Sequence, residues 1–213
     1  TFQEEMIRAN IGVIANVLED HMDVMGPTLD EVADALKATI PYRGHLVIAD
    51  GPYVHYFVRE ARKRKTQVYI ADPSRIPEGY LKKFPYMLFP ENVAVALTVA
   101  KVVGINEKTA FKGMLNANPD PGAMRILKLN NHSLPVYFVN GFAANDPHST
   151  LQIWNRLGVL GYPTSNPIII MNCREDRVDR TVQFTKDVLP HIKMDTLIVI
   201  GQAVSPVIED YSA

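Results

Sequence analysis

The chain has 213 residues, of which 47% are hydrophobic, so it can bury a substantial core in one large domain or in two smaller ones. Lys and Arg total 22 against 23 Asp and Glu, and this balance argues against general affinity for nucleic acid, which needs a strongly basic face. A single cysteine, Cys173, excludes an intrachain disulfide and favours a reducing, cytosolic setting.

The first half of the chain alternates apolar strands with amphipathic helices. Because a β-α-β rhythm of this kind returns each strand in the same direction, it favours a parallel or mixed sheet with helical crossovers. The apolar periodicity predicts strands over residues 11–17, 45–49 and 67–71, and helices over residues 2–9, 30–39, 53–65, 91–103 and 107–115.

A stretch rich in Asn, Pro and Gly, residues 116–122, interrupts regular structure and places a domain boundary near residue 126. The pattern then resumes, with strands predicted over residues 136–139, 168–171 and 197–200 and helices over residues 150–160 and 181–189. The sequence therefore predicts an α/β protein with one domain over residues 1–125 and a second, smaller α/β domain over residues 126–213.

Two of the predicted strands run directly into clusters of ionisable residues. The first strand is followed by Glu19, Asp20, His21 and Asp23. Ligands of open α/β sheets bind just beyond the carboxyl ends of the strands. Carboxylates beside an imidazole suit a divalent metal, and Mg²⁺ takes one or two protein carboxylates together with phosphate oxygens. The structural alternative is a polar strand end whose side chains cap the next turn.

The second cluster, residues 172–180, contains three Arg and three carboxylates within seven residues. An amino-acid ligand needs a guanidinium for its carboxylate and a carboxylate for its ammonium group, which makes Arg174, Asp176 and Arg177 candidates for substrate binding. The alternative is a surface ion-pair network, which contributes little stability. We favour the functional interpretation. Cys173 has no His close in sequence, so we interpret it as a packing residue.

Several other polar positions are candidates for nucleotide contacts. Asn92, at the start of an apolar helix, can pair with a purine edge, or it can cap the helix. Arg125 follows a rigid turn and can clamp phosphate, or it can simply solvate the surface. Asn145 and Asp146 lie in a loop of small residues and can hold ribose hydroxyls or a metal-bound water. The alternative for that loop is a polar connection in which a hydroxyl side chain caps the next helix.

In chain order these segments resemble the Mur ligases, a family that includes the folylpolyglutamate synthetases. A more specific resemblance is to the ligase subunits of poly-γ-glutamate synthases, the PgsB or CapB type, and it covers essentially the whole chain. The segments that carry it are Asp20-His21-Met22-Asp23-Val24-Met25-Gly26-Pro27-Thr28-Leu29, Asn118-Pro119-Asp120-Pro121-Gly122-Ala123-Met124-Arg125, Phe138-Val139-Asn140-Gly141-Phe142-Ala143-Ala144-Asn145-Asp146 and Met171-Asn172-Cys173-Arg174.

This resemblance implies a fold and a reaction. Residues 1–125 would be the C-terminal part of a Mur-ligase-like ATPase domain, and residues 126–213 a truncated, Rossmann-like C-terminal domain. The sequence contains no Gly-x-x-x-x-Gly-Lys-[Ser/Thr] motif, so we expect the P-loop to lie outside this chain and the fragment alone to be inactive. The implied reaction is ATP-dependent polymerisation of glutamate through γ-carboxyl linkages, via an acyl phosphate. The alternatives are another Mur-type ligase and a non-catalytic binding or assembly fragment.

The resemblance also implies roles for individual residues. His21 matches the metal-binding His of the family, with Asp20 beside it to hold or orient the metal. Asn92 matches the Asn that contacts adenine, and Arg125 matches the Arg that reaches phosphate from the hinge between domains. Residues 140–146 match a loop used for nucleotide contacts, through Asn140, Asn145 and Asp146. Two family positions differ in that loop, where Gly141 replaces an Asp of many relatives and Ala143 a Lys of some.

The implied cofactors are ATP and Mg²⁺, with Mn²⁺ as the alternative metal, and Lys37 is the nearest candidate for the modified Lys that bridges metals in several Mur enzymes. The implied partners are glutamate, the growing poly-γ-glutamate chain and the membrane subunits of a bacterial synthase complex that makes capsule, with no nucleic acid. No signal peptide is visible, and no apolar run approaches the roughly 20 residues that span a bilayer. We therefore expect a cytoplasmic protein, held at the inner face of the membrane by its partner subunits.

Overall fold

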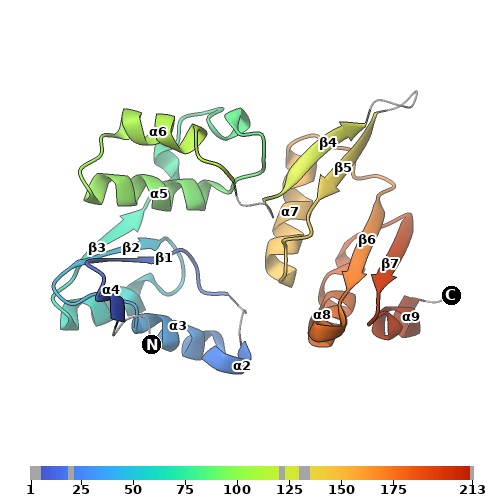
Figure 1. The fold of residues 1–213 in the computed structure, drawn as a ribbon, viewed down its shortest axis with the longest axis horizontal. Coiled ribbons are helices and arrows are strands. Elements are labelled where there is room, and N and C mark those ends of the chain that lie inside the picture. The colour runs from blue at the N-terminus through green and yellow to red at the C-terminus, as the bar shows by residue number, and fades with distance from the viewer. Residues whose placement is uncertain (1–5, 19–21, 120–122, 130–134, 212–213) are drawn as a thin grey trace. The chain divides into compact units, whose positions relative to one another are not determined.

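The structure is a computed structural model that describes residues 6–18, 22–119, 123–129 and 135–211 (Figure 1). Its internal contacts divide the chain into two compact units, Thr1–Asn118 and Pro119–Ala213. Among the described residues, every helix is too short or too polar to serve as a membrane span.

The first unit is built on a three-stranded parallel sheet in which the central strand is also the second in sequence. Helical crossovers join the strands, and one helical layer lies on each face of the sheet (Figure 1). The strands are β1 (Ile11–Ile14), β2 (His45–Ala49) and β3 (Gln67–Ala71), and the helices are α2 (Met22–Met25), α3 (Leu29–Lys37), α4 (Val54–Lys63), α5 (Pro90–Val102) and α6 (Glu107–Leu115), with 3₁₀ turns η1 (Pro73–Arg75) and η2 (Leu81–Lys83).

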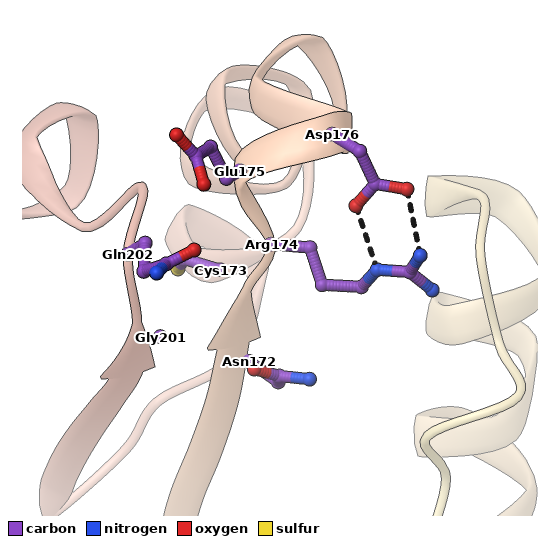
Figure 2. Close-up of a pocket in the computed structure, with 7 residues that line it drawn as sticks. All are labelled: Asn172, Cys173, Arg174, Glu175, Asp176, Gly201 and Gln202. Carbon is purple, nitrogen blue, oxygen red and sulfur yellow. Dashed lines mark hydrogen bonds and ion pairs between the residues drawn. The ribbon is translucent and has the colours of Figure 1, made fainter.

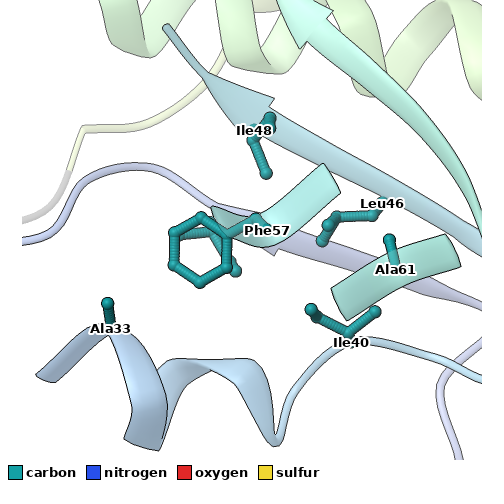
Figure 3. Packing of buried hydrophobic residues seen from close by; sticks show 7 residues of the cluster. Ala33, Ile40, Leu46, Ile48, Phe57 and Ala61 are labelled. Carbon is teal, nitrogen blue, oxygen red and sulfur yellow. The ribbon is translucent and has the colours of Figure 1, made fainter. Parts of the chain in front are cut away.

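The core of this unit explains why β2 is apolar along its whole length. Leu46 and Ile48 point into a cluster with Phe57 beneath α3 and α4 (Figure 3). Val47, which points the opposite way, packs with Ala94 of α5 on the other face of the sheet. A strand that is buried on both faces is typical of a parallel sheet covered by helices on each side.

Local signals agree with the boundaries of most elements in this unit. The predicted strands over residues 45–49 and 67–71 and the predicted helix over residues 107–115 coincide with β2, β3 and α6. The helix α3 begins at a capping box, in which the Thr28 hydroxyl accepts from Glu31 N at 3.3 Å and the Glu31 carboxylate accepts from Thr28 N at 3.1 Å. The strand predicted over residues 11–17 is shorter, because its pairing with β2 ends at Ile14.

The second unit contains two separate two-stranded sheets among its described residues. One is antiparallel and pairs β4 with β5, and the other is parallel and pairs β6 with β7. Its elements are β4 (Arg125–Leu129), β5 (Val136–Asn140), α7 (Pro147–Val159), β6 (Ile168–Cys173), η3 (Glu175–Arg177), α8 (Val178–Asp187), η4 (Leu189–His191), β7 (Thr196–Gly201) and α9 (Ser205–Tyr211).

The core of the second unit lies on one face of the β6–β7 pair. Cys173, Leu189 and Val207 are buried there, and the inward side chains of both strands, among them Met171 and Val199, pack around them. The helices α8 and α9 pack against each other over this cluster. This packing fixes the carboxyl ends of β6 and β7 side by side, which positions the site described next.

Candidate functional site

An open hollow of about 540 Å³ lies beyond the carboxyl ends of β6 and β7 (Figure 2). The two strands are parallel and finish in register, with Cys173 opposite Gly201. This is the place where open α/β sheets bind ligands. The residues that line the hollow are Asn172, Cys173, Arg174, Glu175, Asp176, Gly201 and Gln202.

The sequence predicts one wall of this hollow but not the other. Residues 172–176 belong to the predicted cluster, but Gly201 and Gln202 were not predicted. At Gly201 the backbone φ is +107°, and a Cβ atom there would overlap the carbonyl oxygen of Cys173. That oxygen accepts from Gln202 N at 3.0 Å and from Ala203 N at 3.1 Å. A glycine directly after an apolar run is the signal that could have marked this turn.

A pair of opposite charges dominates one side of the hollow (Figure 2). The Arg174 guanidinium donates to both oxygens of Asp176, with Nε–Oδ1 at 2.9 Å and Nη2–Oδ2 at 2.6 Å. Arg177 Nε lies 4.0 Å from the same Oδ2. The Arg174 and Asp176 side chains are 63% and 58% exposed, so solvent screens their attraction and the pair adds little to stability.

The ion pair changes the acidity of both partners in the expected directions. The hydrogen bond from Arg174 lowers the pKa of the Asp176 carboxyl, and the hydrogen bond to Asp176 raises the pKa of Arg174. Both groups are therefore charged at neutral pH. Figure 2 shows Glu175 on the other side of the hollow, near Gln202. Residues 174–177 thus carry two cations and two anions, an arrangement that complements a zwitterion such as an amino acid.

Cys173 is the buried residue of this wall. Its side chain is fully buried and packs with Leu189 and Val207. Burial raises the pKa of the Cys173 thiol, so it stays protonated at neutral pH and is a poor nucleophile. The interpretation of Cys173 as a packing residue is confirmed.

A second group of predicted residues comes together on the β4–β5 pair. Arg125 and Asn140 occupy directly opposed positions in the antiparallel register, although they lie in different strands. Opposed residues project from the same face of a sheet, with Cβ atoms about 5 Å apart. The Asn140 side chain also accepts from Phe142 N at 3.4 Å, which starts the turn into the following loop. An exposed Arg and an Asn amide therefore share one face at the beginning of this loop.

The loop ends at the first turn of α7, and Asp146 is the cap of that helix. Asp146 Oδ1 accepts from Ser149 N at 2.8 Å, and Pro147 occupies the first helical position. The helix thus begins before the predicted residue 150, and a carboxylate caps it instead of a hydroxyl side chain. Asn145, directly before the cap, is exposed.

Because one Asp146 oxygen accepts a hydrogen bond from the helix, two substitutions separate the effect of this cap on stability from the effect of the charge. Asp146→Ala is expected to lower the free energy of unfolding by about 1 kcal/mol, since it leaves a helix N–H without its acceptor. Asp146→Asn keeps the cap and is expected to change stability by less than about 0.5 kcal/mol. Urea unfolding measures both. Equal losses from the two variants would show that the charge of Asp146 matters for stability and its capping hydrogen bond does not.

Asn92 lies in the first unit, on the surface of α5. The helix N-cap is Phe89, and Asn92 is an exposed residue in the first helical turn whose backbone N donates to Phe89 O at 3.2 Å. The alternative that Asn92 caps the helix is therefore wrong. Its amide group is available at the surface, while the rest of α5 buries Val93 and Leu97.

The residues predicted to meet the metal, Asp20 and His21, lie outside the described residues. Within the part of the chain that the structure describes, no cluster of three or more His, Cys, Asp and Glu residues could hold a metal ion. Lys37 forms an ion pair with Asp34 at 2.5 Å. The hydrogen bond to Asp34 raises the pKa of Lys37, which keeps its amine protonated and so disfavours covalent modification of this Lys.

Comparison with known proteins finds similar sequences for both halves of the chain. A model of the poly-gamma-glutamate synthase CapB C-terminal domain matches residues 126–213. The chain is 63% identical to the PGA synthase CapB of Bacillus subtilis (strain 168) over 210 residues, which is 99% of this chain and 53% of the relative. It is 61% identical to the capsule biosynthesis protein CapB of Bacillus anthracis over 206 residues, 97% of this chain and 44% of that protein. The chain therefore spans about half the length of these curated relatives.

Solved structures share the fold at low sequence identity. MurF from Acinetobacter baumannii superposes with a TM-score of 0.69 and 14% identity, over 99% of this chain and 51% of that one. A bifunctional folylpolyglutamate synthase/dihydrofolate synthase from Yersinia pestis, complexed with AMPPNP and Mn ion, has a TM-score of 0.69 and 14% identity, over 97% of this chain and 52% of its own. The predicted Mur-ligase-like α/β fold is confirmed.

Proposed function

Residues 126–213 belong to the family of poly-gamma-glutamate synthase CapB C-terminal domains, and from this premise we propose that the chain is part of an ATP-dependent amide ligase that polymerises glutamate through its γ-carboxyl group. The observation that carries the proposal is the close similarity to two CapB proteins along nearly the whole chain. The fold agrees with it, because the same fold occurs in MurF and in folylpolyglutamate synthases.

The reaction needs an activated carboxyl group. A carboxylate is a poor electrophile, because attack by an amine would have to expel oxide. Transfer of the γ-phosphoryl group of ATP to the carboxylate gives an acyl phosphate and ADP. The amine nitrogen of an incoming glutamate then attacks the acyl carbon, phosphate leaves with the electrons of the C–O bond, and the nitrogen loses a proton. Positioning and charge neutralisation dominate catalysis of phosphoryl transfer.

The hollow beyond β6 and β7 is where we place the incoming glutamate. Arg174 and Arg177 would receive its carboxylates, and Asp176 would receive its ammonium group. Because Asp176 already occupies the fork of Arg174, an incoming carboxylate has to share that guanidinium or displace Asp176. The structural alternative, a surface ion-pair network, does not explain why Arg174 and Asp176 line a hollow.

The remaining predicted residues would hold the nucleotide. Arg125 would stabilise phosphate, supported by Asn140, which shares its face of the β4–β5 pair. Asn145 and Asp146 would contact the nucleotide from the loop before α7, and Asn92 would read adenine from the exposed face of α5.

Mg²⁺, or Mn²⁺ in its place, would neutralise phosphate charge when bound. Asp20 and His21 would hold it. We also propose that membrane subunits of a capsule-forming synthase complex keep the protein at the inner face of the membrane, with the growing poly-γ-glutamate as its product.

Labelled glutamate tests the proposal. The complete protein is expected to hydrolyse ATP in the presence of glutamate and to form a labelled polymer whose NMR spectrum shows γ-amide linkages. The 213-residue chain alone is expected to show no turnover, because it lacks a phosphate-binding loop motif. Transfer of label to a folate or to a peptidoglycan precursor would identify a different Mur-type ligase. Absence of glutamate-dependent turnover in the complete protein would favour a binding or assembly role.

A further inference from the structure

The hollow beyond β6 and β7 is lined by two carboxylates whose surroundings differ. Asp176 accepts two hydrogen bonds from the Arg174 guanidinium, at 2.9 and 2.6 Å, and Arg177 Nε lies 4.0 Å from it. Glu175 is the preceding residue and lines the same hollow. Among the described residues, the Glu175 side chain takes part in no hydrogen bond or ion pair. One carboxylate is therefore held by cations, and the other is free.

The free carboxylate lies on the side of the hollow away from the ion pair. Figure 2 shows the Glu175 side chain near Gln202, whereas Arg174 and its partner lie on the other side. The backbone N of Gln202 donates to Cys173 O at 3.0 Å, which holds this wall of the hollow against the end of β6. Both Glu175 and Gln202 are exposed, so water and a small ligand can reach them.

The proposed reaction has to remove protons from the nitrogen of the incoming glutamate. An ammonium group has three N–H bonds and the amide product has one, so two protons leave. The first leaves before attack, because the nitrogen needs a free electron pair. The second leaves once the C–N bond forms, when the nitrogen is again cationic and is more acidic than the original ammonium group. A carboxylate within hydrogen-bond reach can accept this second proton.

Asp176 is poorly suited to accept that proton. The hydrogen bond from Arg174 lowers the pKa of the Asp176 carboxyl, which makes this carboxylate a weaker base. Its negative charge still suits the binding of an ammonium group, as proposed above. Glu175 has no cation to displace, and its exposure lets it pass a proton on to water. Two carboxylates in different surroundings can divide charge stabilisation and proton transfer between them.

We propose that Glu175 is a catalytic residue that accepts the proton of the attacking nitrogen, a role that rests on the proposed ligase function. The electron pair of the amine forms the C–N bond to the acyl carbon. The N–H bond then breaks, and its proton passes to a Glu175 carboxylate oxygen. The C–O bond to phosphate breaks, and phosphate leaves with that electron pair. Glu175, now a carboxylic acid, returns the proton to water. The Gln202 amide can donate a hydrogen bond that orients the carboxylate.

A second nucleophile separates this role from activation of the carboxyl group. Hydroxylamine is uncharged at neutral pH, and it converts an acyl phosphate to a hydroxamate without a carboxylate to take its proton. In the complete protein with ATP and short poly-γ-glutamate, Glu175→Gln is expected to slow amide formation with glutamate about 100-fold or more. Hydroxamate formation and the glutamate concentration for half-maximal rate are expected to stay within about fivefold. Glu175→Asp, which keeps a carboxylate, is expected to recover part of the lost rate.

The matched control is Glu209→Gln, which removes an exposed carboxylate from α9 of the same unit and is expected to leave both rates within about twofold. Unchanged amide formation in Glu175→Gln would overturn the proposal. Equal losses of amide and hydroxamate would also overturn it, because they would place Glu175 in carboxyl activation or in folding. If the unsubstituted protein forms neither product, the proposed ligase function itself is wrong, and the role of Glu175 is wrong with it.

Discussion

Gly201→Ala is expected to lower the free energy of unfolding of the second unit by about 3 kcal/mol and to close the hollow beyond β6 and β7. At this position φ is +107°, and the added Cβ would overlap the carbonyl oxygen of Cys173. A backbone oxygen cannot move aside as a flexible side chain can. The two strand ends must therefore separate, which breaks the contacts of that oxygen with Gln202 N and Ala203 N.

Gly161 provides the matched control for this prediction. It also lies in the second unit and has φ +81°, but a Cβ atom there would meet open space. Gly161→Ala is therefore expected to cost only about 1 kcal/mol, the strain of a left-handed alanine. The difference between the two variants isolates the overlap with Cys173.

Tryptophan fluorescence measures the stability of the second unit, in which both substitutions lie. The chain has a single tryptophan, Trp154, which belongs to α7 of the second unit. Its urea unfolding curve reports this unit even where the first unit unfolds separately. Equal midpoints for Gly201→Ala and Gly161→Ala would show that the turn at Gly201 accepts a side chain, and would contradict the geometry of the hollow.

Arg174→Ala in the complete protein is expected to raise the glutamate concentration needed for half-maximal ATP turnover by about 10- to 100-fold. A hydrogen bond between a guanidinium and a carboxylate contributes about 1.5–3 kcal/mol, and tenfold in affinity corresponds to about 1.4 kcal/mol. Lys186→Ala, which removes an exposed cation from the far end of α8, is the control and is expected to have no effect. An unchanged glutamate requirement in Arg174→Ala would remove the hollow from the substrate site.

Asp176→Asn separates two roles of the partner carboxylate. If Asp176 receives the ammonium group of glutamate, as we propose, this variant weakens glutamate binding despite freeing the fork of Arg174. If Asp176 only neutralises Arg174, the variant binds glutamate more tightly. A glutamate titration of ATP turnover distinguishes these outcomes, and tighter binding would contradict the proposed ammonium contact.

The pH dependence of this ion pair follows from the lowered pKa of Asp176. The folded protein keeps the carboxylate ionised to a lower pH than the unfolded chain does. The stabilisation by the pair is therefore present above the ordinary carboxyl pKa of about 4, and it is lost as the pH falls through the lower folded value. Exposure keeps this contribution small. Between pH 5 and 8 both groups of this pair stay charged, so the pair adds no pH dependence to the glutamate titrations. These titrations are therefore best carried out in this pH range.

Local patterns alone determined most elements and the fold class. The strands β2 and β3 coincide with the predicted ranges. Each is a continuous apolar run, and the residues on either side that interrupt regular structure fix where the strand begins and ends. The cluster over residues 172–180 was identified for a similar reason, since its charges directly follow an apolar strand. The resemblance to the CapB-type ligases could also be recognised from the sequence alone, because it depends only on the residues of a few segments and on their order along the chain.

Other features depended on contacts between distant segments, and only the tertiary structure decided them. The strand β4 is largely exposed and mixes charged with apolar residues, so its pairing with β5 defines it, and this pairing sets Arg125 opposite Asn140. Gly201 became part of the hollow because β7 pairs in register with β6. In the same way, Arg8, Arg43 and Lys65 lie at one end of the first sheet, because its three parallel strands all begin at that end. Hydrogen-bond register and packing select such neighbours, and neither is encoded in the order of residues along one segment.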